Sequence, residues 1–261
     1  MQLHVEAHGG GSPLVLSHGF AGSARNFLPQ VRAQSKSSRI WLYDSRGHAR
    51  SEAPQSELAY SWNCLISDFD HVVRQSLEET NKLADPRLVV GGLSLGAATA
   101  LFWALEHPGA VRGLVLAAYP ESTDEMRNWA LQFATHIERN GLDRAGSEFI
   151  WGPQGRYEMT DSRQIRRGIL EHSPRALVST LRQAMARIPD IGTLREELEQ
   201  FSVPTLLVVG DRDRSSIAVS HLIADAVPSA RLAIIKSAGH VVNLSQPATF
   251  NQELSHFIGA L

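Results

Sequence analysis

Short apolar runs alternate with longer segments of helical periodicity along most of the chain. Runs rich in β-branched residues and bounded by glycine, proline or polar residues predict strands. We expect seven strands, at about residues 2–7, 13–17, 39–43, 88–92, 113–118, 205–209 and 231–235. Apolar residues at three- and four-residue spacing predict amphipathic helices. We expect three of these helices at about residues 61–80, 95–107 and 247–259. This alternation is typical of an α/β protein with a mostly parallel sheet that is covered by helices on both faces.

The alternation stops at about residue 120 and resumes at about residue 202. The intervening segment has helical periodicity and no convincing strand pattern, and Ser173 followed by Pro174 predicts the start of one of its helices. A helical insertion between two strands, placed over the strand ends, forms a cap that walls a pocket and can open as a lid. We therefore expect two parts, an α/β core of residues 1–119 and 202–261 and an all-helical cap of residues 120–201.

Composition narrows the class of protein. The chain has 261 residues, of which 43% are hydrophobic and 20% charged, as in ordinary globular enzymes. Its formal net charge is −2, so its electrostatics do not favour nucleic acid or an anionic membrane as a partner. No apolar run is long enough to span a bilayer, and the N-terminus lacks the pattern of a signal peptide. The single cysteine, Cys64, suits a reducing compartment. We expect a cytoplasmic protein with a small-molecule substrate, no cofactor and no metal; its oligomeric state stays open.

The segment Gly92-Leu93-Ser94-Leu95-Gly96 lies between a predicted strand and a predicted helix. A serine at such a turn adopts a strained backbone conformation that lifts its hydroxyl above the sheet, and the flanking glycines avoid clashes there. This pentapeptide also occurs by chance, so its partners decide its meaning. A serine nucleophile needs a histidine as base, and the histidine needs a carboxylate that orients it.

Two later strand ends supply these partners in the order serine, acid, histidine. The strand predicted at 205–209 is followed by Asp211 and Asp213, and the strand predicted at 231–235 is followed by His240. The carboxyl ends of parallel strands meet at one edge of a sheet, where open α/β proteins collect their chemistry. We therefore expect the serine, one of the two aspartates and the histidine to form a triad.

With these motifs the chain resembles the α/β-hydrolases that carry a helical cap. This group includes esterases, lactonases, thioesterases and carbon–carbon bond hydrolases, and the resemblance spans almost the whole chain. The residues that carry it are His18 to Phe20, Asp44 to His48, Gly92 to Gly96, Val203 to Asp213, Ala238 to His240, Gln246, Pro247 and Phe250. The resemblance implies an α/β-hydrolase fold with a sheet of seven to eight strands. The family usually has eight, and the first antiparallel strand is missing or short here.

The resemblance also implies roles for individual residues. Ser94 matches the nucleophile of the family and His240 matches its general base. The acid of the family usually lies three residues after the glycine that ends the strand, which selects Asp213 over Asp211. An oxyanion hole in this fold uses two backbone N–H groups, one directly after the nucleophile and one in a loop after an earlier strand. By matching position these belong to Leu95 and Phe20.

Other residues near these motifs have a structural interpretation. His18 and the loop from Asp44 to His48 are expected to brace the active-site face. In the cap, the aromatic residues Trp129, Phe133 and Trp151 either line the substrate pocket or pack between helices. The cap is rich in arginine, and an arginine that faced the pocket would bind a substrate carboxylate. Arginine outnumbers lysine throughout the chain, however, so we expect most cap arginines at the surface.

The sequence favours one reaction class. Family members that act on haloalkanes or epoxides use an aspartate as nucleophile, so Ser94 argues against both. We expect a serine hydrolase for a small to medium carboxylic ester or lactone, most similar in length and cap layout to the enol-lactonase group. The alternatives are a thioesterase, a carbon–carbon bond hydrolase, a lyase or synthase with the same triad, and a ligand sensor that turns over slowly or not at all.

Overall fold

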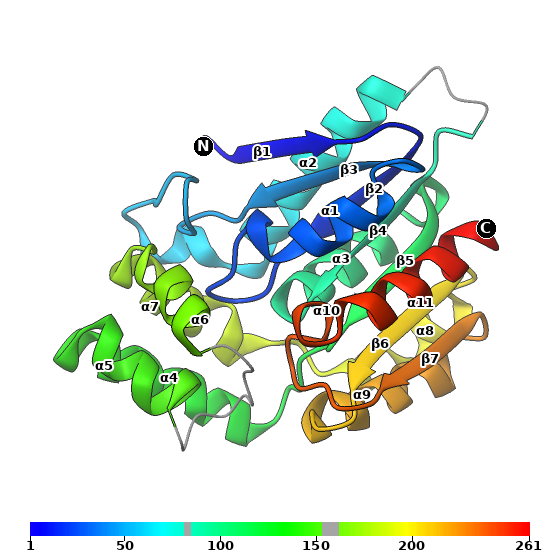
Figure 1. Cartoon of the computed structure of the whole chain (residues 1–261). Helices are drawn as coiled ribbons and strands as arrows, with labels where there is room; N and C mark the ends of the chain where they lie inside the picture. The colour runs from blue at the N-terminus through cyan, green and yellow to red at the C-terminus, as the bar shows by residue number, and fades with distance from the viewer. Residues whose placement is uncertain (81–84, 153–161) are drawn as a thin grey trace.

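One seven-stranded sheet runs through the centre of the protein (Figure 1). The coordinates are a computed structural model that describes residues 1–80, 85–152 and 162–261. The strands are β1 (His4–His8), β2 (Ser12–Ser17), β3 (Ser38–Asp44), β4 (Leu88–Leu93), β5 (Val111–Ala117), β6 (Thr205–Gly210) and β7 (Ala230–Ile235). Their order in the sheet is β1-β3-β2-β4-β5-β6-β7. β1 pairs antiparallel with β3 and every other pair is parallel, which confirms the predicted α/β fold and all seven predicted strands.

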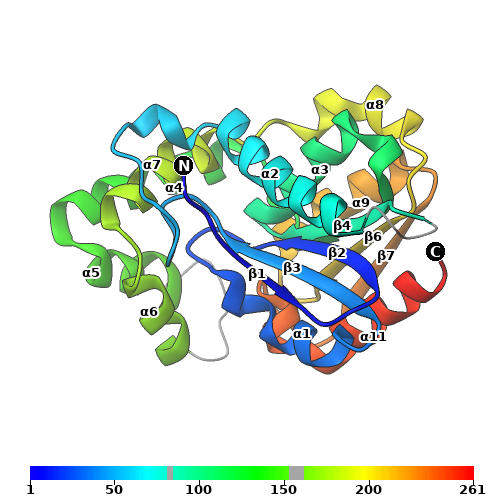
Figure 2. The ribbon, with the colours of Figure 1, turned by 90° about the horizontal axis from the view of Figure 1, so that it is seen from above.

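Helices cover both faces of the sheet, as the continuous apolar strands require. The core helices are α1 (Leu28–Gln34), α2 (Trp62–Thr80), α3 (Leu95–Glu106), α9 (Arg214–Ala226), α10 (Val242–Ser245) and α11 (Pro247–Gly259). Figure 2 shows α2, α3 and α9 on one face and α1 and α11 on the other. The helices predicted at 61–80, 95–107 and 247–259 correspond to α2, α3 and α11.

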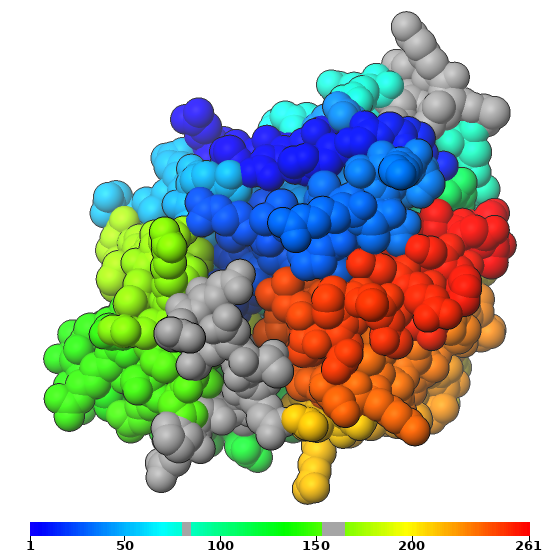
Figure 3. Space-filling view, viewed as in Figure 1, coloured from blue at the N-terminus to red at the C-terminus, as the bar shows by residue number. Residues whose placement is uncertain are grey.

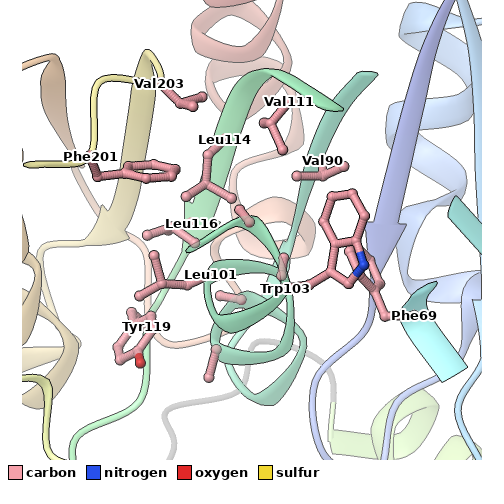
Figure 4. Packing of buried hydrophobic residues seen from close by; sticks show 14 of the residues in the cluster. Phe69, Val90, Leu101, Trp103, Val111, Leu114, Leu116, Tyr119, Phe201 and Val203 are labelled. Carbon is pink, nitrogen blue, oxygen red and sulfur yellow. The ribbon is translucent and has the colours of Figure 1, made fainter. Parts of the chain in front are cut away.

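Alternate residues of each strand face opposite layers. In β3, Trp41 and Tyr43 pack with the cluster under α2 and α3, whereas Ile40 and Leu42 pack with the cluster under α11. Figure 4 shows the first of these clusters, in which the buried Trp103 of α3 lies between the strands and α2. Burial on both faces makes the sheet a rigid frame for the loops at its carboxyl edge.

The segment between β5 and β6 contains helices and, in its described part, no strand. These helices are α4 (Asp124–Asn140), α5 (Leu142–Gly146), α6 (Ser162–Leu170), α7 (Pro174–Gln183) and α8 (Arg195–Gln200). Helices α4 to α7 form a body at one side of the sheet, seen in green and yellow-green in Figure 3, and their apolar cluster also takes in Ala21, Leu65 and Leu95 of the core. The predicted start of a helix after Ser173 is confirmed, because the Ser173 side chain caps α7 by accepting from the Ala176 amide.

The end of this segment packs differently from its beginning. Leu198 of α8 belongs to the sheet cluster that also contains residues of α2 and α3, and Figure 2 shows α8 on the same side of the sheet as those two helices. The apolar residues up to Ile188 belong instead to the cluster of the outer body. We use "cap" for residues 120–201 as predicted; its outer bounds stay a prediction, and residues 153–161 of it lie outside the described part of the chain.

Candidate active site

Ser94 lies in the turn between β4 and α3 with a backbone conformation that non-glycine residues rarely adopt. Its φ of 54° and ψ of −117° lie outside the helical and extended regions. The Ser94 amide donates to the Ala117 carbonyl at 2.8 Å, which ties the turn to the neighbouring strand β5. Strained conformations of this kind persist where the surroundings over-determine them, and they concentrate at functional sites.

Glycine is required on both sides of Ser94 because the backbone of β2 passes close to the turn. A Cβ at Gly96 would lie 2.1 Å from the Ser17 carbonyl oxygen, and a Cβ at Gly92 would lie 2.5 Å from the same atom. Gly19 approaches Ser94 itself, since a Cβ at Gly19 would lie 3.3 Å from the Ser94 Cβ. The serine turn and the loop after β2 therefore pack backbone against backbone.

Asp213 and His240 are joined by a short hydrogen bond. The His240 Nδ1 lies 2.7 Å from the Asp213 Oδ2, and both residues are buried. Asp213 also caps α9 by accepting from the Ser216 amide. Burial raises the pKa of the Asp213 carboxyl most strongly, but His240 and Ser216 together outweigh it, so the pKa lies below its usual value. An ionised carboxylate on Nδ1 leaves Nε2 as the nitrogen that can accept a proton.

Asp211 takes a different place. It is exposed, and its Oδ1 accepts a hydrogen bond from the Ala238 amide at 3.2 Å. The loop after β6 therefore directs Asp213 toward His240 and directs Asp211 toward the backbone of the loop after β7. The structure thus brings the histidine together with the aspartate that lies three residues beyond Gly210.

The two amides predicted for an oxyanion hole belong to residues that flank the serine turn. Leu95 is the first residue of α3, and the first N–H groups of a helix have no acceptor within it. Phe20 follows Gly19, whose backbone lies against Ser94. The Phe20 ring is held edge-on between two aromatic rings, His48 at 6.2 Å and Phe133 of the cap at 6.2 Å between centroids.

The loops after β2 and β3 are cross-braced by buried histidines. The His18 Nδ1 donates to the Gly19 carbonyl at 2.7 Å, and its Nε2 accepts from the Ser45 amide at 2.9 Å. The buried Asp44 carboxylate accepts from the Ala24 amide at 2.8 Å. These contacts to backbone groups are those expected of bracing residues, and burial lowers the pKa of His18 to about 4.

The three cap aromatics named by the sequence occupy one apolar cluster. Phe133 is fully buried and contacts the Phe20 ring, so it joins the cap to the loop after β2. Trp129 lies 5.4 Å from Phe133 between ring centroids and is partly buried. Trp151 ends a π-helical turn (Ser147–Trp151) and is partly buried in the same cluster. Phe133 contacts a residue of the predicted oxyanion hole, and a pocket role for all three aromatic residues stays a prediction.

A histidine of the cap, His172, contacts the loops beside the site, and the sequence did not predict this contact. His172, between α6 and α7, is 5% exposed and bonds to the backbone of two loops of the core. Its only sequence signal is its place next to Ser173, the N-cap of α7. A histidine before a helix cap is ordinary, so the sequence gives no reason to place it beside the residues after β2.

An imidazole that a carboxylate orients can act as a base toward a hydroxyl that reaches its other ring nitrogen. The described residues contain no group of three or more histidine, cysteine or acidic side chains that could hold a metal ion. In the same described part of the chain, no helix combines the length and apolar character needed to cross a membrane.

Comparisons with known proteins find a family and relatives that match most of the chain. The sequence model of a family described as "Alpha/beta hydrolase family" matches residues 14–253. A putative 2-succinyl-6-hydroxy-2,4-cyclohexadiene-1-carboxylate synthase of Bacillus subtilis (strain 168) is 27% identical over 265 residues, which cover 95% of this chain and 90% of that protein. A pimeloyl-[acyl-carrier protein] methyl ester esterase of Xylella fastidiosa (strain 9a5c) is 28% identical over 280 residues, which cover 99% of this chain and all of that protein (100%).

Solved structures share the fold at lower sequence identity. A thermophilic esterase from Thermogutta terrifontis superposes with a TM-score of 0.84 and is 23% identical, and the match covers 99% of this chain and 93% of that chain. At this identity the likeness concerns the fold alone. The sheet and its helical insertion are thus an arrangement that is already known in an esterase.

Proposed function

The chain belongs to the alpha/beta hydrolase family, and on that premise we propose that it hydrolyses a small to medium carboxylic ester or lactone through an acyl-enzyme on Ser94. The observation that carries the proposal is the 2.7 Å contact between the His240 Nδ1 and the Asp213 Oδ2 at the sheet edge where Ser94 follows β4. A buried carboxylate on one ring nitrogen orients the other nitrogen as a base for the serine. The esterase among the relatives supports the same reaction class.

In this reaction the Ser94 Oγ attacks the substrate carbonyl carbon while the His240 Nε2 takes the hydroxyl proton. Asp213 stabilises the imidazolium that forms. The imidazolium then gives its proton to the leaving alkoxide, and the C–O bond of the ester breaks; in a lactone the alcohol stays attached to the acyl group. Water repeats the attack with His240 as base, which releases the carboxylic acid and restores the serine.

The developing negative charge lies on the carbonyl oxygen. The amides of Phe20 and Leu95 would donate to it, and loss of one such donor lowers kcat by roughly 10²–10³ in enzymes of this type. Both donors are backbone groups, so the shape of the loop after β2 controls them more than any side chain does. The packing of Gly19 against Ser94 supports this assignment.

Hydrolysis of a p-nitrophenyl ester series from acetate to decanoate tests the proposal. We expect steady turnover by the wild type and a loss of at least about 10³-fold in kcat for Ser94→Ala. The chain length with the highest kcat/KM measures the pocket below the cap. Turnover that survives in Ser94→Ala would contradict the proposal, and a single burst followed by arrest would favour the ligand-sensor alternative.

A synthase reaction is the second candidate because one relative is named as a putative synthase. The product in that name carries a carboxylate, which a buried arginine would bind well. Among the cap residues whose side chains the structure describes, no arginine is buried, and Arg166 and Arg182 form ion pairs with Asp143 and Glu138. This distribution favours an uncharged ester or lactone. Absence of ester turnover together with elimination activity on a carboxylate substrate would reverse the ranking.

A further inference from the structure

Ala21, directly after Phe20, is held at both ends by histidine side chains. Its φ of 54° is left-handed, a conformation that is unfavourable for a residue with a Cβ. Its amide donates to the His48 Nε2 at 3.2 Å, and its carbonyl accepts from the His172 Nε2 at 2.9 Å. Two hydrogen bonds to histidines outside the loop therefore stabilise the left-handed conformation of Ala21, which is unfavourable for an alanine on its own.

His172 binds a second left-handed alanine with its other ring nitrogen. The Ala49 amide donates to the His172 Nδ1 at 2.8 Å, and Ala49 has a φ of 41°. One buried imidazole of the cap thus joins the loop after β2 to the loop after β3. No apolar side chain of similar size supplies both the acceptor and the donor that this position uses.

Three of the buried histidines, His18, His48 and His172, form a continuous column. Their ring centroids are 5.2 Å apart for the first pair and 5.1 Å for the second. Each ring donates to one backbone carbonyl and accepts from one backbone amide, so the bonds require neutral imidazoles. The neutral His48 ring faces His172, and so do the charged groups of Asp44, Glu171 and Arg25. Burial has a larger effect than these charges and lowers the pKa of His172.

We propose that His172 is a positioning residue, through which the cap holds Phe20 and Ala21 in the conformation that directs the Phe20 amide at the oxyanion. This inference rests on the proposed hydrolase function. The Phe133 ring of the cap supports the same loop from its other side by packing on Phe20. Loss of the His172 bonds lets Ala21 relax from its left-handed conformation, which turns the peptide groups beside it.

A pair of substitutions at this position tests the inference. His172→Phe keeps a ring but removes both hydrogen bonds, whereas His172→Gln keeps one acceptor and one donor. We expect kcat for p-nitrophenyl butyrate to fall roughly 10- to 100-fold in His172→Phe with KM within about threefold of the wild type, because an oxyanion donor acts in the transition state. In His172→Gln we expect most of the kcat to return. His71→Phe, at an exposed histidine of α2, is the matched control and should leave kcat unchanged.

Amide hydrogen exchange gives a readout that does not depend on activity. We expect the peptide that contains Ala21 to exchange at least about tenfold faster in His172→Phe than in the wild type, with slower exchange again in His172→Gln. Faster exchange without loss of kcat, unchanged exchange, or equal loss of kcat in both variants would each overturn the inference. If Ser94→Ala retains turnover, the proposed function fails instead, and the exchange result still decides whether His172 holds the loop.

Discussion

At the scale of single residues, Asp211 and Asp213 lie in one short loop but do different things. Asp213 reaches the imidazole of His240, while Asp211 bonds to the Ala238 amide from an exposed position. Asp213 directly precedes α9, where its Oδ1 caps the helix by accepting from the Ser216 amide and its Oδ2 reaches His240. The two aspartates therefore form a natural pair of test and control.

Asp213→Asn should lower kcat for ester hydrolysis by roughly 10³–10⁴-fold, because an amide neither fixes the tautomer of His240 nor stabilises its charged form. Asp211→Asn keeps an oxygen that can accept from Ala238, and its kcat should stay within about twofold of the wild type. Steady-state kinetics of the two variants at neutral pH checks this. Equal losses in both variants, or a larger loss in Asp211→Asn, would contradict the assignment of the acid.

The sequence indicated some of these contacts and not others, for a physical reason. Ser94, Asp213 and His240 each follow a strand, and parallel strands bring their ends to one edge, so local pattern implied proximity. His172 follows no strand. Its position depends on how the cap docks on the core, which is decided by side-chain packing between distant segments and leaves no local pattern.

At the scale of elements, β4, the serine turn and α3 pack so closely against β2 that the glycines on either side of Ser94 have no room for a side chain. Both Gly96 in α3 and Gly168 in α6 are helical glycines, yet their surroundings differ. A Cβ at Gly96 would lie 2.1 Å from the Ser17 carbonyl oxygen, whereas a Cβ at Gly168 would meet nothing within 4 Å. The close approach at Gly96 is to backbone of β2, which cannot move without disturbing the sheet.

Gly96→Ala should lower the free energy of unfolding by roughly 1–3 kcal/mol, the usual effect of overpacking. Gly168→Ala should raise it by about 0.5–1 kcal/mol, because alanine is the better helix former where there is room. Denaturant unfolding of the two variants beside the wild type measures both changes. Stabilisation by Gly96→Ala would show that the backbone of β2 is not fixed as described.

Helix and strand positions followed closely from the apolar pattern, but helix partners did not. α8 was predicted as part of the cap, and its Leu198 packs with the sheet cluster. An amphipathic pattern predicts that one face of a helix is buried, but it does not predict which surface of the protein covers that face. The cap cluster, with Phe133 at its contact to Phe20, likewise required the packed structure.

At the scale of the whole molecule, the column of buried histidines makes stability depend on pH. Burial lowers the pKa of His18 to about 4 and the pKa of His48 well below its usual value, and it lowers that of His172 as well. An unfolded histidine titrates near 6.5, so between that pH and about 4 the unfolded chain binds more protons than the folded one. The free energy of unfolding therefore falls as the pH falls through this window.

His18 alone should reduce the free energy of unfolding by roughly 2 kcal/mol between pH 7 and pH 5, and the other two histidines should add to this loss. Urea unfolding at pH 7, 6 and 5 measures the effect, and most of it should appear before the carboxylates begin to titrate. Addition of salt should change it little, since burial rather than surface charge causes it. A free energy of unfolding that is level from pH 7 to pH 5 would contradict the neutral, bonded state of the column.

The chain leaves the sheet at the end of β5 and returns in the adjacent strand β6. β5 and β6 are parallel, and at the start of β6 the Leu114 amide donates to the Pro204 carbonyl at 2.9 Å, so the two joints of the inserted segment lie at opposite ends of neighbouring strands and are both fixed by the pairing of β5 with β6. The entropic cost of closing a flexible loop rises only with the logarithm of its length, by about 0.6 kcal/mol per doubling. Evolution can therefore lengthen, shorten or exchange the helices between these joints while the sheet and the residues at its edge are inherited unchanged.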